Sequence, residues 1–201
     1  MKPQLLALML ALPVSPAVAH HPGERIDEVM ADREPDFEPT DLRRTPQLGG
    51  SATDGVPMRI SDFNDKIVVV SFIPEACSTL CDAQQGLLRE VQAGVNVTPM
   101  RDQVIFVTVG AASSEGWDDT NWQQLEPEGS AAEASAAFSS LSGLENDAPM
   151  IHIVDRSGRH AAIFHGADFG HVSLILYINE LTNAAPLHEP GLLSRIFRSF
   201  R

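Results

Sequence analysis

The stretch from Ile67 to Val91, IVVVSFIPEACSTLCDAQQGLLREV, decides how the rest of the sequence is interpreted. It opens with four β-branched apolar residues and continues through Phe72 and Ile73, a pattern typical of a strand buried on both faces. Pro74 has no backbone N–H to give to a sheet ladder, so the strand is expected to end there.

Beyond this proline the apolar residues change to helical spacing. Leu80, Leu87, Leu88 and Val91 recur every three or four residues, which predicts a helix with these side chains on one side. A buried strand, a short turn and a helix are therefore expected in direct succession.

Cys77 and Cys81 are the only cysteines and stand four residues apart at the start of the predicted helix. That spacing puts both on one helix face with Cα atoms roughly 6 Å apart, within disulfide reach. The unpaired amides and the positive dipole end favour thiolate, which attacks disulfides and binds soft metal ions. We interpret the pair as a redox or metal-binding centre; the alternative is an inert structural disulfide or two buried thiols. A strand, a turn and two cysteines opening a helix form the active-site layout of a thioredoxin-like fold.

Composition limits the classes of protein that fit. A chain of 201 residues with 43% hydrophobic content suits one domain with flexible ends. The formal net charge is −13 and the only lysines are Lys2 and Lys66, which argues against nucleic-acid binding. The acid excess is compatible with basic or cationic partners.

Residues 1–19 have the pattern of a cleaved secretory signal peptide. Lys2 precedes an apolar run from Leu5 to Leu12, and Ala17-Val18-Ala19 forms an A-x-A cleavage site. The run is far shorter than the ~20 residues that a membrane span requires. Export to an oxidising compartment, a bacterial periplasm, is therefore expected.

Cleavage after Ala19 would expose His20-His21 at the new N-terminus. The free amine and the imidazoles could chelate Cu(II), although histidines at such a position are also found without a role. The acidic, proline-containing segment of residues 20–46 is interpreted as a flexible linker.

The remaining pattern predicts an α/β thioredoxin-like domain over residues 47–185, with a central mixed sheet flanked by helices and an N-terminal β-hairpin. The hairpin turn is assigned to Asp54-Gly55, and the loop of residues 110–129 carries Trp117 and Trp122. Further strands are expected at 58–60, 103–109, 150–155 and 160–165, and helices at 130–141 and 172–181. The basic amphipathic tail, residues 186–201, is interpreted as a frayed terminus or a weak membrane-surface contact.

Several motifs follow one another in a fixed order along residues 35–184. They are Asp36-Phe37, DGVPMRISDFNDK, CSTLC, NVTPMRDQVIFVTV, Asn121-Trp122, HIVDRSG, Phe164-His165-Gly166 and YINELTN. The ordered set, more than CSTLC alone, resembles the Sco/SenC family of copper-handling thioredoxin-like proteins. The resemblance implies delivery of copper to the dinuclear copper centre of cytochrome c oxidase, or reduction of its cysteines. It also implies copper held by both CxxxC cysteines and by a histidine before the third strand.

Two positions depart from the family pattern. Counting back from Gly158, the histidine ligand falls at Asp147, and carboxylate is a hard, poor partner for Cu(I). Pro149 stands nine residues before Gly158, where the TlpA/ResA thiol-disulfide proteins place a cis-proline beside the sulfurs. Both departures favour dithiol exchange over copper binding.

A substitute for the missing ligand is sought among the soft and nitrogen-bearing side chains. His152 is the first choice because Pro149 would bring the start of its strand near the sulfurs, although strand alternation leaves its face undetermined. The other candidates, each of which is more often structural, are His160, His165, His171, Met100 and Met150.

The expected function is that of an exported Sco-like protein that assists copper-centre assembly, with Cys77 attacking first and Cys81 resolving. Its expected partners are a copper-site client such as an oxidase subunit and a thiol-disulfide redox partner, with copper as Cu(I) or Cu(II). The alternatives are a general periplasmic thiol-disulfide oxidoreductase without a metal role, or a copper sensor or storage module based on His20-His21. Nothing beyond the cysteine pair indicates a peroxidase.

Overall fold

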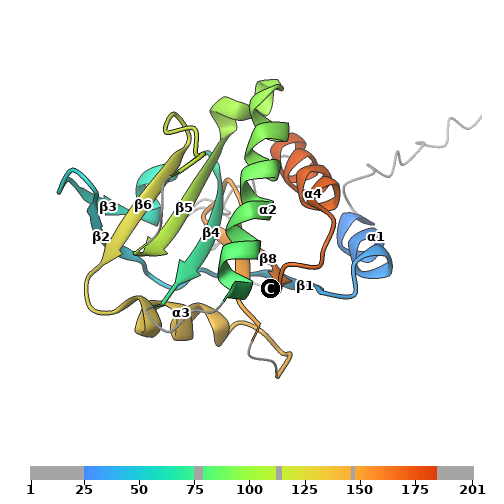
Figure 1. Ribbon diagram of the computed structural model, residues 1–201. Coiled ribbons are helices and arrows are strands. Elements are labelled where there is room, and N and C mark those ends of the chain that lie inside the picture. Colours follow the sequence, from blue (N-terminus) through green and yellow to red (C-terminus); the bar gives the residue numbers. More distant parts are fainter. Residues whose placement is uncertain (1–24, 75–78, 112–114, 146–147, 185–201) are drawn as a thin grey trace, which may run out of the picture.

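The computed structural model describes residues 25–74, 79–111, 115–145 and 148–184, which form one mixed sheet with helices on both faces (Figure 1). The strands are β1 (Phe37–Arg44), β2 (Gly49–Ala52), β3 (Pro57–Arg59), β4 (Ile67–Ile73), β5 (Val104–Gly110), β6 (Trp122–Pro127), β7 (Met150–Val154) and β8 (Arg159–His165). The helices are α1 (Ile26–Arg33), α2 (Thr79–Asn96), α3 (Ala131–Ser139) and α4 (His171–Asn183), with 3₁₀ turns η2 (Ile60–Phe63) and η3 (Pro99–Gln103).

Strand β4 lies at the centre of the sheet, as its sequence predicts. The strand order is β1-β8-β7-β4-β5-β6-β2-β3, and β4 runs parallel to β5 and antiparallel to β7. Every residue from Ile67 to Phe72 is at most 4% exposed. A strand with no face in water needs cover on both sides, which the order β4-α2-β5-β6-α3-β7-β8-α4 provides.

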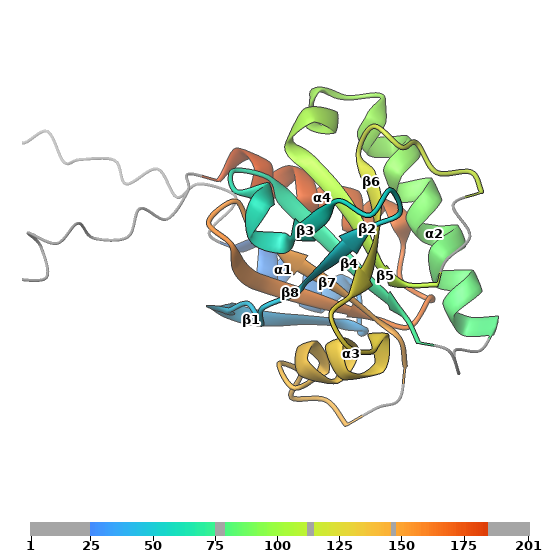
Figure 2. The ribbon, with the colours of Figure 1, turned by 90° about the vertical axis from the view of Figure 1, so that its left-hand side faces the viewer.

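The two faces of β4 belong to two separate clusters of core residues. Ile67 and Val69 pack with side chains of α2 and α4, including Leu88 and Leu174. Val68, Val70 and Phe72 face the opposite way and pack with Phe138 of α3. Helix α3 therefore covers one face alone, while α2 and α4 share the other (Figure 2).

The segment interpreted as a flexible linker is folded between Arg25 and Arg44, so that prediction was wrong for this part. Helix α1 buries Met30, and β1 pairs antiparallel with β8 at the edge of the sheet. The ring of Phe37 lies 5.1 Å, centroid to centroid, from both Phe164 and Tyr177. Few apolar side chains are present, but Phe37 packs against partners more than a hundred residues away, which local composition does not reveal.

The loop expected over residues 110–129 is also partly a strand. β6 runs parallel to β5, but only Trp122 and Leu125 of its six residues are buried, so the period-two signal of a strand is missing. The rings of Trp117 and Trp122 stack at 4.5 Å, and the Trp122 indole N–H donates to Thr108 Oγ1 at 2.9 Å.

Most other predicted elements are present within a residue or two of their expected bounds. The β2–β3 hairpin turns at Asp54-Gly55, where Gly55 has a φ of 80° that suits glycine. Ser130 and Glu133 form the predicted capping box of α3. Leu80 is an exception: it is 37% exposed rather than buried with Leu88.

A chain of hydrogen bonds runs through two buried histidines under α3. The Thr40 hydroxyl donates to the His160 carbonyl at 2.7 Å, so its oxygen accepts from His160 Nδ1 at 2.8 Å. His160 Nε2 is then the acceptor for His152 Nδ1–H at 2.9 Å. Burial lowers the pKa of His160 to about 4 and that of His152 well below its ordinary value. Both rings are neutral in the folded protein.

We expect the two neutral rings to make stability depend on pH. Unfolding restores ordinary histidine pKa values, so below pH 6.5 the unfolded chain binds protons that the folded protein refuses; for His160, whose folded pKa is about 4, stability falls until about pH 4. The shifted pKa of His160 alone should lower the free energy of unfolding by about 2 kcal/mol when the pH falls from 7 to 5. Urea denaturation at the two pH values measures the loss.

The control for this prediction is the exposed His171, whose replacement by glutamine should leave the pH profile as it is. His160→Asn should flatten it. An unchanged slope in His160→Asn would contradict the assignment of the pH dependence to the buried chain.

Candidate functional site

The candidate site lies where β4 ends and α2 begins. Pro74 closes β4, and Cys81 sits in the first turn of α2, 2% exposed and disulfide-bonded. Cys77, the only other cysteine in the sequence, lies outside the described residues, as does Asp147. The predicted signal peptide, His20-His21 and the residues after Ala184 are also outside them.

The inner face of α2 carries buried glutamines that the sequence analysis did not single out. Gln85 is 5% exposed; its Nε2 donates to Ser71 Oγ at 3.0 Å, and its Oε1 accepts from Thr108 Oγ1 at 3.3 Å. These bonds tie α2 to β4 and β5. The signal was available, because Gln84 and Gln85 stand three and four residues after Cys81 and so share its face.

Gln84 links α2 to the residue just before β7 and to the residue just after β8. Its side chain is fully buried, and Nε2 donates to the carbonyl oxygens of Pro149 at 2.9 Å and Gly166 at 2.7 Å. The Gly166 amide donates to the same Pro149 oxygen at 2.8 Å. Pro149 is thus linked to the helix of Cys81 by one intervening side chain.

Pro149 does not have the cis geometry that the TlpA/ResA resemblance implies. Among peptide bonds between described residues none is cis, so the Ala148–Pro149 bond is trans. Pro149 therefore lies in contact with the cysteine helix, but in the trans conformation.

His152 lies on the opposite face of the sheet from α2. It pairs with Val70 across the β4–β7 ladder, and its ring centroid is 5.7 Å from that of Phe72 and 5.1 Å from that of Phe138. Those rings belong to the core under α3. The described structure therefore does not bring His152 to Cys81.

The other suggested ligands are also engaged elsewhere. His160 belongs to the chain with Thr40, His165 Nε2 lies 3.0 Å from Glu38 Oε2, and His171 Nδ1 lies 3.3 Å from Glu90 Oε2. The described residues contain no group of three histidine, cysteine or acidic side chains arranged for a metal ion. Met100 and Met150 are both 8% exposed, as core residues.

Glu38 anchors the segment that leads from α3 toward Pro149. It accepts hydrogen bonds from the Ser142 hydroxyl and the Gly143 amide, both at 2.6 Å, and contacts His165. Partial burial opposes its ionisation, but the bonds from Gly143, Ser142 and His165 outweigh that and lower the pKa of Glu38. The carboxylate therefore fixes this segment as an ionised acceptor.

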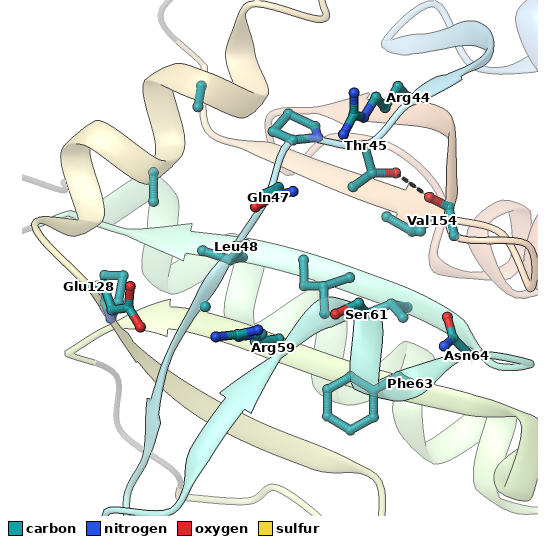
Figure 3. Close-up of a pocket in the computed structure, with 18 of the residues that line it drawn as sticks. Arg44, Thr45, Gln47, Leu48, Arg59, Ser61, Phe63, Asn64, Glu128 and Val154 are labelled. Carbon is teal, nitrogen blue, oxygen red and sulfur yellow. Dashed lines mark hydrogen bonds between the residues drawn. The ribbon is translucent and has the colours of Figure 1, made fainter.

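Two cavities flank the sheet at opposite ends of β4. One of about 590 Å³ is lined by Ile73 and Pro74, the last residues before the cysteine region, together with the start of α3. The other, of about 740 Å³, is lined by Val68 near the beginning of β4. Figure 3 shows Leu48, Arg59 and Val154 among the residues around it. Arg44, Arg59 and Glu128 on its walls give it mixed charge. Only the first is adjacent to the cysteine region.

Within residues 25–184, gaps aside, the structure contains no helix that is both long and apolar enough to cross a bilayer.

Comparison with known proteins shows a shared fold without close sequence relatives. No family model and no curated protein matches the sequence. A SCO1/SenC family lipoprotein from Bacillus anthracis str. Ames is similar in structure, with a TM-score of 0.55 and 17% identity over 73% of this chain and 98% of that chain. BsSco, a member of the Sco family of cytochrome c oxidase assembly proteins, has a TM-score of 0.56 and 12% identity over 74% and 98%.

A thioredoxin family protein is similar to a lesser degree. The thiol:disulfide interchange protein from Chlorobium tepidum TLS has a TM-score of 0.50 and 15% identity over 71% of this chain and 97% of that chain. At these identities the likeness establishes the thioredoxin-like fold, in agreement with the sequence prediction and with the strand order of the sheet.

We expect Glu38→Gln to destabilise the protein by about 1–2 kcal/mol at pH 7. Neutral hydrogen bonds would replace charge-assisted ones, and the NH2 group of the new amide would face hydrogen-bond donors instead of accepting from them. Urea denaturation measures the effect. Asp32→Asn, at an exposed acid of α1, is the control and should change little. Equal stability of the Glu38 variant and the control would show that the carboxylate does not hold the segment.

Proposed function

We propose that this chain is an exported Sco-like protein that assists the assembly of a copper centre by thiol-disulfide exchange at Cys77 and Cys81. The observation that carries the proposal is the disulfide-bonded Cys81 in the first turn of α2, the helix that follows the buried strand β4 in the sequence. The fold shared with Sco-family structures supports it. Thiol chemistry at that point of the fold needs no further cofactor.

The two cysteines take different roles in the proposed exchange. The Cys77 thiolate attacks a client disulfide, forms a mixed disulfide and releases one client sulfur as thiolate. Cys81 then loses its thiol proton and attacks the Cys77 sulfur, and this step releases the second client sulfur and closes the Cys77–Cys81 disulfide. One electron pair passes to the client, and a dithiol partner restores the pair. The burial of Cys81 suits the resolving role.

Copper is cargo in this proposal. Two thiolates hold Cu(I) in linear geometry, and a neutral nitrogen would complete a tighter site. Asp147 stands at the position of the family histidine, and His152 is packed across the sheet, so copper binding is weak and depends on both cysteines. A general thiol-disulfide oxidoreductase without copper is the second candidate, favoured by the contact that links Pro149 to the cysteine helix.

The exchange roles predict a trapped intermediate. Cys81→Ser should accumulate a mixed disulfide between Cys77 and a small disulfide substrate, whereas Cys77→Ser should not, because Cys81 is buried. Mass spectrometry of the two variants separates these outcomes, with the wild-type chain losing two daltons on oxidation. If Cys77 and Cys81 stay reduced in the presence of an oxidant, the proposed redox function is refuted.

If the chain carries copper, it should bind Cu(I) weakly, and this binding should require both cysteines. Asp147→His should tighten it, since imidazole replaces a hard ligand, and His152→Ala should leave it unchanged. Pro149→Ala should mainly slow exchange with dithiols. Competition against a Cu(I) chelator measures the affinities, with reduction of a disulfide substrate measured alongside.

The copper part fails if neither wild type nor Asp147→His takes Cu(I) from the chelator in the reduced state. Exchange activity retained by the same samples would then support the general oxidoreductase. A loss of Cu(I) affinity in His152→Ala would instead show that the ring reaches the metal.

A further inference from the structure

The side-chain oxygen of Gln84 is buried and has no hydrogen-bond partner among the residues that the structure describes. The orientation of the amide is fixed by chemistry, because the Pro149 and Gly166 atoms that it meets are carbonyl oxygens and only accept. Nε2 must face them, so Oε1 points away from both. A buried acceptor left unpaired is unfavourable and calls for an explanation.

The position of Gln84 on α2 points to the donor that this oxygen lacks. Cys81, Gln84, Gln85 and Leu88 form one buried stripe of the helix. Side chains in a helix lean toward its N-terminus and cover the preceding turn, which for Gln84 is the turn that holds Cys81. Of its neighbours along the stripe three and four residues away, Leu88 has no polar hydrogen, whereas a cysteine thiol has one.

The redox state of Cys81 accounts for the missing bond. The sulfur is in a disulfide in this structure and carries no hydrogen. Reduction adds two electrons and two protons to a disulfide, and one of those protons makes the Cys81 sulfur an S–H donor. The unpaired oxygen is thus a feature of the oxidised form.

We propose that Gln84 is a positioning residue that holds Cys81 as a protonated thiol after reduction, its Oε1 accepting the S–H hydrogen. The inference rests on the proposed dithiol function and deepens it. The two bonds from Nε2 prevent the amide from turning away, so the oxidised form keeps an unpaired acceptor and the reduced form pairs it. Gln84 therefore shifts the equilibrium toward the dithiol, the form that reduces client cysteines.

The test compares two neighbouring glutamines in the thiol-disulfide equilibrium with glutathione, in which the protein disulfide and two glutathione thiols give the protein dithiol and glutathione disulfide. Gln84→Met should shift the constant about tenfold toward the protein disulfide, which is about 30 mV in potential. Gln85→Met removes a second buried amide, whose partners are Ser71 and Thr108, and it should stay within about twofold of wild type.

A second measurement does not depend on the folding of Gln84→Met. In reduced Cys77→Ser the only thiol is that of Cys81, and its infrared S–H stretching band should lie at the lowered frequency of a hydrogen-bonded thiol. A band at the frequency of an unbonded thiol would overturn the inference.

The outcomes separate the inference from the proposed function. A wild-type chain that does not exchange with glutathione at all overturns both. Wild type that exchanges normally, with Gln84→Met at the wild-type constant or Gln85→Met shifted as far as Gln84→Met, overturns the role of Gln84 alone.

Discussion

The burial of β4 on both faces is the constraint on which the rest of the structure depends. Its residues from Ile67 to Phe72 leave almost nothing to solvent, so the chain must supply helices to each side of the sheet. α2 and α4 meet the need on one side and α3 on the other. Because α2 is the next helix after β4, the requirement for cover also brings the first turn of α2, which carries Cys81, to the end of the central strand (Figure 1).

Apolar contact alone would leave α2 able to slide, because the hydrophobic effect has no direction. Hydrogen bonds do have direction, and the polar groups of the sheet beneath α2 require partners. Ser71 and Thr108 form hydrogen bonds with Gln85. Further along the helix, the side-chain amide of Gln92 donates to Asn121 Oδ1 at 2.8 Å. The helix is thereby held in one register, and so is the depth at which Cys81 sits.

Sequence signals were sufficient wherever the determinants lie close together in the chain. The apolar runs of β4 and β5, the capping box at Ser130 and the turn at Gly55 are local, and each appears where it was expected. The fold class followed from their order.

What could not be predicted depends on contacts between distant residues. α1 and β1 owe their order to partners such as Tyr177, whose hydroxyl donates to Asp27 at 3.0 Å from 150 residues away. Strand alternation alone does not determine on which face of the sheet His152 lies, because that depends on which helix covers which side. From the sequence alone, Gln84 and Gln85 of α2 would be assigned to a solvent-exposed face. Their burial is explained only by their hydrogen bonds to Pro149 and Ser71.

The two outermost strands of the sheet have a consequence for how the protein behaves among copies of itself. β1 contains Pro39 and then a bulge in which Asp41 and Leu42 have φ of 52° and 53°, so its outer edge is bent and lacks a regular row of donors. β3 is three residues long and begins with Pro57. Neither edge offers the long, flat template onto which a second chain could add a strand. These irregular borders therefore remove one route by which copies of the chain could aggregate.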